Sequence, residues 1–138
     1  TALTLLEGGR LEMCEQNALM FDDRIAYDDD YAGLALDADE GDRLAAKLGN
    51  RSVLMMASHG VMVVGPNIAE AFNDLYYLER AAKFQILARS TGLPLRTISD
   101  RVRDTVRQQM ATERGKVADR HFAALRRILD RQEPAYRN

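Results

Sequence analysis

Two short uncharged runs lie near the middle of the chain. Residues 53–57 (VLMMA) and 61–64 (VMVV) are apolar, and Ser58-His59-Gly60 separates them. Apolar runs of this length between turn residues indicate buried strands. Gly60 supplies backbone freedom and allows two arrangements. The runs either pair with each other across this glycine or form one strand that bends there.

A long helix is predicted directly after the second run. Pro66 suits a loop or a first helical turn, and the side chain of Asn67 suits an N-cap. The helix is expected to end near Ser90, before the breaker sequence TGLP. Apolar residues at helical spacing form the stripe expected to face the core, and its members are Ile68, Phe72, Leu75, Ala82 and Ile86.

Glu79 falls on that same stripe. An unpaired buried carboxylate costs much free energy, so Glu79 is expected either to have a partner or to reach solvent. The ordinary interpretation is a salt bridge to Lys83 or Arg80. The alternative is a second-layer role, in which Glu79 holds a histidine ring in position behind a metal ion.

The pattern outside this region predicts one more strand and several helices. Acidic residues at the start of a helix and glycine at its end mark the helix boundaries. Strand, helix and strand in this order indicate an α/β fold whose sheet need not be parallel. The expected elements are a helix end at 2–6, a short helix at 11–20, a strand at 24–27, a helix from 37 to Gly49, and a long helix capped by Thr97 or Ser99 that Gly115 splits.

Composition places the chain among ordinary globular domains. It has 138 residues, of which 46% are hydrophobic and 29% charged, and this is enough for one domain with a modest core. No apolar run approaches the length of a membrane span, so we expect no membrane partner. A single cysteine excludes an internal disulfide framework and favours a cytoplasmic location.

The charges are unevenly distributed. Residues 1–48 carry 12 acidic and 4 basic side chains, whereas residues 96–138 carry 11 basic and 6 acidic ones. The two ends are expected to meet either within the fold or across subunits. Binding of the basic end to nucleic acid is the rival interpretation. We do not favour it, because the arginines alternate with acids and no aromatic platform accompanies them.

His59 is the residue best placed for chemistry. A single histidine between strands is more often a hydrogen-bonded structural residue, but a turn at a strand end is where functional residues concentrate. Zn²⁺ needs three or four ligands, and the chain offers only His121 and Cys14 besides His59 as nitrogen or sulfur ligands. The run Asp28-Asp29-Asp30 lacks the ligand spacing of a calcium loop and is expected to be a solvated loop.

Three segments resemble the C-terminal half of the class II aldolase/adducin family. They are SHGVMVVG at 58–65, AEAF at 69–72 and YYLERAA at 76–82, and they follow the order and spacing of that family. The resemblance implies an α/β fold, namely a three-layer αβα sandwich with a mixed, largely antiparallel sheet and a long C-terminal helix. Residues 1–95 would be the C-terminal half of the domain, with an incomplete sheet, and residues 96–138 its helical extension.

The resemblance also implies a metal site. In catalytic members the histidine that matches His59 is one of three ligands of a divalent metal, usually Zn²⁺. The other two come from an earlier His-x-His motif, and an acidic catalytic residue lies earlier still. None of these is present here. Residues 1–6 resemble the helix that follows that motif, so we expect a fragment of a protein nearly twice as long.

Three functions follow from the resemblance as expectations. The first is metal-dependent carbon–carbon lyase chemistry, in which a small hydroxycarbonyl or sugar-phosphate-like substrate undergoes aldol cleavage, although related epimerases and decarboxylases use the same metal site. The second is a non-catalytic, adducin-like interaction module. The third is a piece that binds no metal and is inactive by itself. The family further implies a homo-oligomer, often a tetramer, and a C-terminal segment that covers the active site, for which Tyr136 is a candidate.

Overall fold

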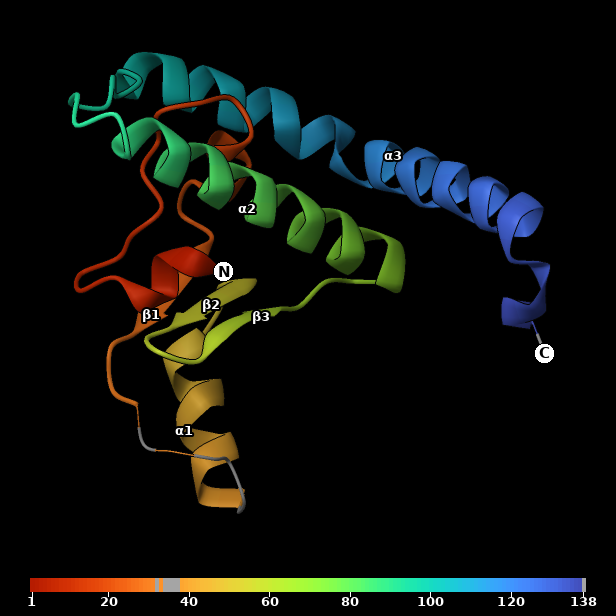
Figure 1. The fold of residues 1–138 in the computed structure, drawn as a ribbon, viewed down its shortest axis with the longest axis horizontal. Helices are drawn as coiled ribbons and strands as arrows, with labels where there is room; N and C mark the ends of the chain where they lie inside the picture. Colours follow the sequence, from red (N-terminus) through yellow and green to blue (C-terminus); the bar gives the residue numbers. More distant parts are fainter. Residues whose placement is uncertain (32, 34–37, 138) are drawn as a thin grey trace.

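The computed structural model describes residues 1–31, 33 and 38–137. Its strands and helices follow the predicted order (Figure 1). They are η1 (Ala2–Leu5), η2 (Ala18–Phe21), β1 (Ile25–Asp28), α1 (Ala38–Leu48), β2 (Val53–Met56), β3 (Gly60–Val63), α2 (Ile68–Arg89), α3 (Asp100–Gln132) and η3 (Pro134–Arg137), where η denotes a 3₁₀ helix.

The described strands form one three-stranded sheet in the order β1-β2-β3. β1 and β2 are parallel, and α1 lies between them in sequence, whereas β2 and β3 are antiparallel with Met56 opposite Gly60. Of the two arrangements left open for the apolar runs, pairing across the turn is therefore the correct one. All four residues of β2 are buried, but those of β3 are only half-buried, because β3 lies at an edge of this sheet.

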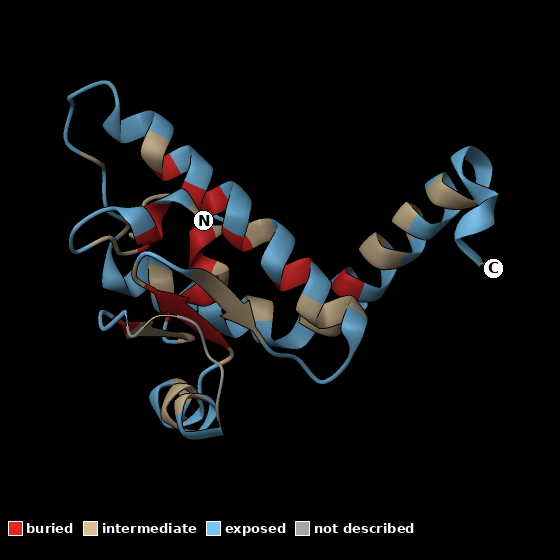
Figure 2. Ribbon diagram, turned by 60° about the horizontal axis from the view of Figure 1, so that its bottom comes forward, coloured by how far each residue is buried: buried red, intermediate tan, exposed pale blue. Residues whose placement is uncertain are grey.

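Helices cover both faces of the sheet. α1 lies on one side and α2 on the other, and α3 packs along α2 farther from the sheet (Figure 1). The core lies between β2, α2 and the N-terminal segment, as the buried residues in Figure 2 show. It includes Leu3, Phe21, Met55, Leu78 and Ala81. The three layers of the predicted αβα sandwich and its long C-terminal helix are thus present.

The buried face of α2 differs from the predicted apolar stripe. Ile68 is 76% exposed, and Phe72 and Leu75 are also exposed, although Ala82 is buried as predicted. The face that packs inward carries polar residues with partners: Gln85, for example, accepts from the backbone N–H of Glu12. The stripe was wrong because hydrogen bonds, which hydropathy does not register, allow polar side chains to be buried.

Local hydrogen bonds explain one further difference, and two other predictions can be compared with the structure. The predicted helix at 11–20 is a loop that ends in η2, because the carboxylate of Glu15 accepts from the backbone N–H groups of Asn17 and Ala18 and offers them an alternative to helical bonds. Gly115 does not split α3, which is continuous after Ser99. The predicted N-cap of α2 is confirmed, since Asn67 accepts from the backbone N–H of Glu70.

Ion pairs join the acidic and basic ends of the chain within the fold. Asp74 on α2 is fully buried and accepts from both Arg24, beside β1, and Arg114 on α3. Asp22 accepts from Arg103 at 2.5 Å and from Arg107 at 3.1 Å. α3 buries only Ala118 among its own residues, so these pairs are the main attachment of its first half. Contact between the two oppositely charged ends within the fold is one of the two arrangements predicted from the sequence.

Replacing Asp74 by Asn is expected to lower the free energy of unfolding by about 3–5 kcal/mol, because two partly buried guanidinium groups lose their shared counter-charge. Chemical denaturation measures this quantity. Asp119→Asn on the same helical layer is the control, since Asp119 is exposed and has no ion pair among the residues that the structure describes. Its change should stay within about 0.5 kcal/mol, and equal losses in both variants would refute a special role for Asp74.

Candidate functional site

His59 lies in the tight turn between β2 and β3. Its backbone N–H donates to the carbonyl of Met56 at 3.2 Å, and the N–H of Ser58 donates to the carbonyl of Thr4 at 2.8 Å. Ser58 and Gly60 both have positive φ angles, 56° and 144°, so the turn uses a conformation that few side chains tolerate. The contact with Thr4 attaches the turn to the N-terminal segment.

The imidazole of His59 is exposed and has no hydrogen-bond partner within the described part of the chain. Its one ring contact there is with Tyr31, edge to face, with the ring centroids 6.3 Å apart. Without a hydrogen bond, the ring nitrogen that carries no hydrogen is available to a ligand. The structure therefore confirms the predicted position of His59 at a strand-end turn, while its chemical role stays a prediction.

A charged cluster lies beside His59. Asp28, at the end of β1, is 1% exposed and accepts two hydrogen bonds from Arg43 of α1, at 3.0 and 2.7 Å. Arg43 also donates to both carboxylate oxygens of Glu40. Hydrogen bonds from Arg43 lower the pKa of Asp28 below its ordinary value, against the effect of burial. The expectation of a solvated loop is thus wrong for Asp28, which the guanidinium compensates, and correct for the exposed Asp29 and Asp30.

Little space remains between this cluster and His59. A hollow of about 10 Å³ is lined by residues that include Asp28, Tyr31, Glu40, Met56 and His59. This volume is about that of one water-sized probe. The cluster therefore supports the turn and is not itself a substrate pocket.

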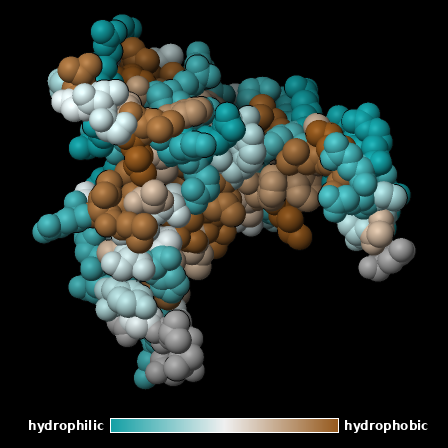
Figure 3. Space-filling view, in the orientation of Figure 1, coloured by the Kyte–Doolittle hydropathy of each residue, from teal (hydrophilic) through white to brown (hydrophobic). Residues whose placement is uncertain are grey.

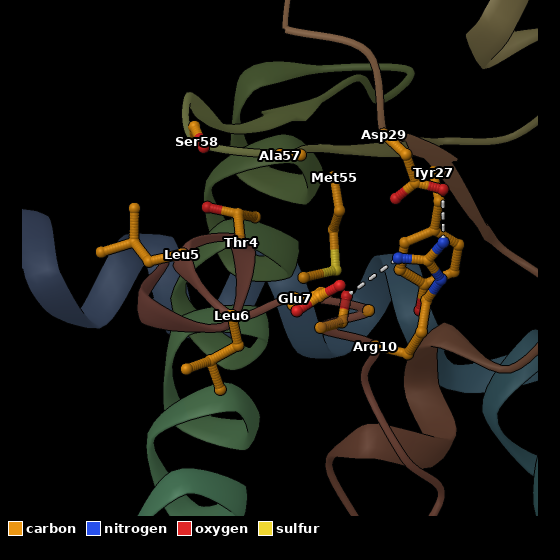
Figure 4. Close-up of a pocket in the computed structure, with 12 residues that line it drawn as sticks. Thr4, Leu5, Leu6, Glu7, Arg10, Tyr27, Asp29, Met55, Ala57 and Ser58 are labelled. Carbon is orange, nitrogen blue, oxygen red and sulfur yellow. Dashed lines mark hydrogen bonds and ion pairs between the residues drawn. The ribbon is translucent and has the colours of Figure 1, made fainter.

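A larger cavity, of about 410 Å³, lies against Ser58 (Figure 4). Thr4 and Leu5 form one side of it, and Arg10 and Tyr27 lie on the opposite side. Arg10 donates to Asp29 at 2.6 Å and lies 4.3 Å from the centroid of the Tyr27 ring. Burial raises the pKa of the Tyr27 hydroxyl, which accepts a backbone hydrogen bond from Leu11. Sequence analysis missed this cavity, because its walls come from three separate segments.

The other predicted site residues lie apart from His59. Glu79 is about half exposed, so it reaches solvent, and its carboxylate lies 3.2 Å from the backbone nitrogen of Thr1. It forms no ion pair with Lys83 or Arg80 among the described residues. Among the described residues it makes no contact with His59. Tyr136 lies in η3, at the far end of α3 from the β2–β3 turn (Figure 1), and donates to Asp130 at 2.6 Å.

His121 is held in an aromatic cluster between α2 and α3. Its Nδ1 lies 3.0 Å from the side-chain oxygen of Asn73, and its ring packs edge to face on Tyr76 with centroids 4.8 Å apart. Burial, the largest influence on Cys14, raises the pKa of its thiol and disfavours the thiolate that a metal requires. Neither residue is arranged as a partner of His59.

The described residues do not by themselves complete a metal site. No three of their histidine, cysteine, aspartate or glutamate side chains lie together in a group that could hold an ion. Asp28 and Glu40 share the hollow beside His59, but Arg43 occupies both carboxylates. His59 can therefore supply one ligand, and the rest of a site would have to come from outside the described residues.

Comparison with known proteins identifies the family. The sequence family described as Class II Aldolase and Adducin N-terminal domain matches residues 1–86. A Caulobacter vibrioides protein of the aldolase class 2 group is 34% identical over 122 residues, which cover 88% of this chain and 47% of that protein. The chain belongs to the class II aldolase/adducin family.

Solved structures agree in fold. A crystal structure of an aldolase II superfamily protein from Pseudomonas syringae superimposes with a TM-score of 0.88 at 34% identity, covering 99% of this chain and 55% of that one. L-fuculose 1-phosphate aldolase from Glaciozyma antarctica superimposes at 0.74 with 19% identity, over 95% of this chain and 49% of that one, and this likeness concerns the fold alone. The chain spans about half the length of these relatives.

The Asp28–Arg43 pair makes stability depend on pH in a defined direction. The folded-state pKa of Asp28 is lowered, so its contribution is fully present above the unfolded-state pKa of about 3.9 and is lost as pH falls through the folded value. Carboxyl-carbon NMR titration should place the pKa of Asp28 below about 3.9.

Arg43→Met tests the cause of that shift. With the guanidinium removed, the largest cause of the lowered pKa is lost while burial remains, so the pKa of Asp28 should rise relative to the wild type. The N–H of Asp30 and Lys47, 3.6 Å away, still favour the ionised form, so the stability that ionised Asp28 confers should be reduced. An unchanged titration of Asp28 in this variant would contradict the assignment.

Proposed function

We propose that the intact protein is a divalent-metal-dependent carbon–carbon lyase, with His59 as one metal ligand. Membership of the class II aldolase/adducin family supports this proposal. The observation that carries it is the exposed imidazole of His59, which makes no hydrogen bond among the described residues, in a turn whose backbone is held by two hydrogen bonds. A structural histidine is usually hydrogen-bonded.

The substrate that we propose is a small hydroxycarbonyl compound, including sugar-phosphate-like ones. The cavity of about 410 Å³ is lined by Ser58, the residue that precedes His59, and its volume falls in the size range of small-molecule pockets. When bound, a divalent metal would supply Lewis-acid stabilisation of the enediolate formed on cleavage. The remaining ligands and the acid or base would lie outside the residues described.

The chain's own contribution would be to hold the imidazole in place. Sites work best when the supporting residues are themselves locked. Thr4 anchors the turn from one side through the N–H of Ser58, and the Asp28–Arg43 pair fixes the end of the adjacent strand. We therefore assign His59 to binding and these neighbours to positioning, and we assign no proton transfer to the described residues.

His59→Ala in the intact protein is expected to remove most of the bound metal. Any aldol-cleavage activity should fall at least 100-fold, which is the order of loss when an electrostatic group that stabilises the transition state is removed. Elemental analysis measures the metal, and aldehyde release measures the cleavage. His121→Ala is the matched control, because His121 is engaged by Asn73 and aromatic rings. A metal-free wild-type protein, or one whose metal survives the His59 change, would sink the lyase proposal.

A non-catalytic, adducin-like interaction module is the second candidate. The exposed apolar residues of α2 favour it, since Ile68, Phe72 and Leu75 provide a surface suited to a protein partner. Apolar side chains also gather on the face seen in Figure 3. A homo-oligomer would use the same surface. Light scattering of the intact protein measures its oligomeric state, and elemental analysis of the same sample distinguishes a metal-free oligomer from a metal-loaded enzyme.

A further inference from the structure

The cavity against Ser58 carries more negative than positive charge on its walls (Figure 4). Of the described residues that line it, Glu7, Arg10 and Asp29 are charged at neutral pH, so two carboxylates face one guanidinium. We propose that this cavity receives an uncharged, hydroxyl-bearing chain of the substrate, and that Glu7 rejects a phosphate group there. This substrate class rests on the function proposed above, and it is narrower because it excludes phosphate esters.

The guanidinium of Arg10 is already engaged on three sides. It donates to the carboxylate of Asp29 at 2.6 Å and to the carbonyl of Gly9 at 3.2 Å, and it lies 4.3 Å from the centroid of the Tyr27 ring. The hydrogen bond to Asp29 is the largest cause that lowers the pKa of this carboxylate. Among the described residues, Arg10 is the one cation that lines the cavity, so a phosphate would have to displace Asp29 from it.

Glu7 supplies the negative charge that is not compensated. Its side chain is exposed, and it makes no hydrogen bond or ion pair within the part of the chain that the structure describes. An ionised carboxylate accepts hydrogen bonds and donates none, so it suits the hydroxyl groups of a substrate. A phosphate ester is repelled instead, because a like charge about 4 Å away in water weakens binding about fivefold for each unit of charge.

The neutral polar groups of the cavity also suit hydroxyl groups. The hydroxyl of Tyr27 accepts from the backbone N–H of Leu11 at 3.2 Å, and it donates to no described residue. The exposed hydroxyl of Ser58 makes no hydrogen bond with any residue that the structure describes. A hydroxyl can both donate and accept, so each of the two can pair with an OH group of a sugar-like chain. Leu5 and Met55 add apolar wall for the C–H groups of that chain.

Three compounds that share a hydroxycarbonyl group test this substrate class. They differ at the other end, which is a methyl group in hydroxyacetone, a hydroxymethyl group in dihydroxyacetone and a phosphate ester in dihydroxyacetone phosphate. NMR titration of the intact, metal-loaded protein measures the dissociation constant of each. Dihydroxyacetone should bind about tenfold more tightly than its phosphate and about threefold more tightly than hydroxyacetone. Equal or tighter binding of the phosphate or of hydroxyacetone would overturn the class, and no saturable binding of any of the three would overturn the site.

Glu7→Gln tests whether this one side chain rejects the phosphate. The change removes the charge and keeps the shape, so dihydroxyacetone phosphate should gain about fivefold in affinity relative to dihydroxyacetone. Glu133→Gln is the matched control, because Glu133 is an exposed residue at the C-terminal end of α3. The control should keep the wild-type ratio of the two dissociation constants. A wild-type ratio in Glu7→Gln would refute the role of Glu7.

Elemental analysis of the same samples separates the substrate class from the lyase function on which it rests. A wild-type protein that holds no metal would refute the lyase function, and the substrate class would fall with it. A metal-loaded protein that prefers dihydroxyacetone phosphate would leave the lyase function standing and overturn only the exclusion of phosphate esters. The two failures therefore give different results.

Discussion

The shared carboxylate of Asp74 is the interaction on which the arrangement of the helices depends. It is fully buried, and two guanidinium groups from different parts of the chain converge on it. Arg24 precedes β1 and also donates to the carbonyl of Met20 and the hydroxyl of Ser52. One buried charge thus connects the sheet, α2 and α3. Such a charge does little for net stability compared with apolar packing, but it penalises arrangements that leave it unpaired.

At the opposite end of the sheet, the candidate site is also supported by a buried aspartate with a guanidinium partner. A buried aspartate, Asp28, ends β1, and Arg43 of the crossover helix holds it. The N-terminal segment fixes the β2–β3 turn through the carbonyl of Thr4. His59 is therefore presented by a turn that is held in place, while its imidazole makes no hydrogen bond within the described part of the chain. Functional side chains on a fixed frame are the usual arrangement in α/β proteins.

Features that depend on local sequence were predictable. The strands on either side of Gly60, the N-cap at Asn67 and the helix that ends before Gly49 all follow from spacing and residue type. The inward face of α2 could not be predicted in this way, because Asp74 and Gln85 are buried through hydrogen bonds and ion pairs with partners far away in sequence. Hydropathy counts only the side chain itself, so it predicted the inward positions of Ala82 and Ile86 but wrongly placed Ile68, Phe72 and Leu75 in the core.

The candidate site likewise has features that the sequence predicts and features that it does not. The turn position of His59 follows from the pattern of strands, and the family resemblance follows from the segments around it. The pairing of Asp28 with Arg43 brings together a strand end and a helix, and no local signal identifies such a pair. The cavity against Ser58 is formed by segments that only the folded chain brings together. Volume, unlike residue type, cannot be inferred from spacing.

The attachment of α3 has a consequence for motion. This helix buries one residue of its own, and its first half is held by charge pairs with the loop and α2. Elements with little buried apolar surface open at a lower free energy than the core. The backbone amides of α3 should then exchange with solvent deuterium before those of β2. Transient opening of α3 is therefore expected while the sheet stays folded.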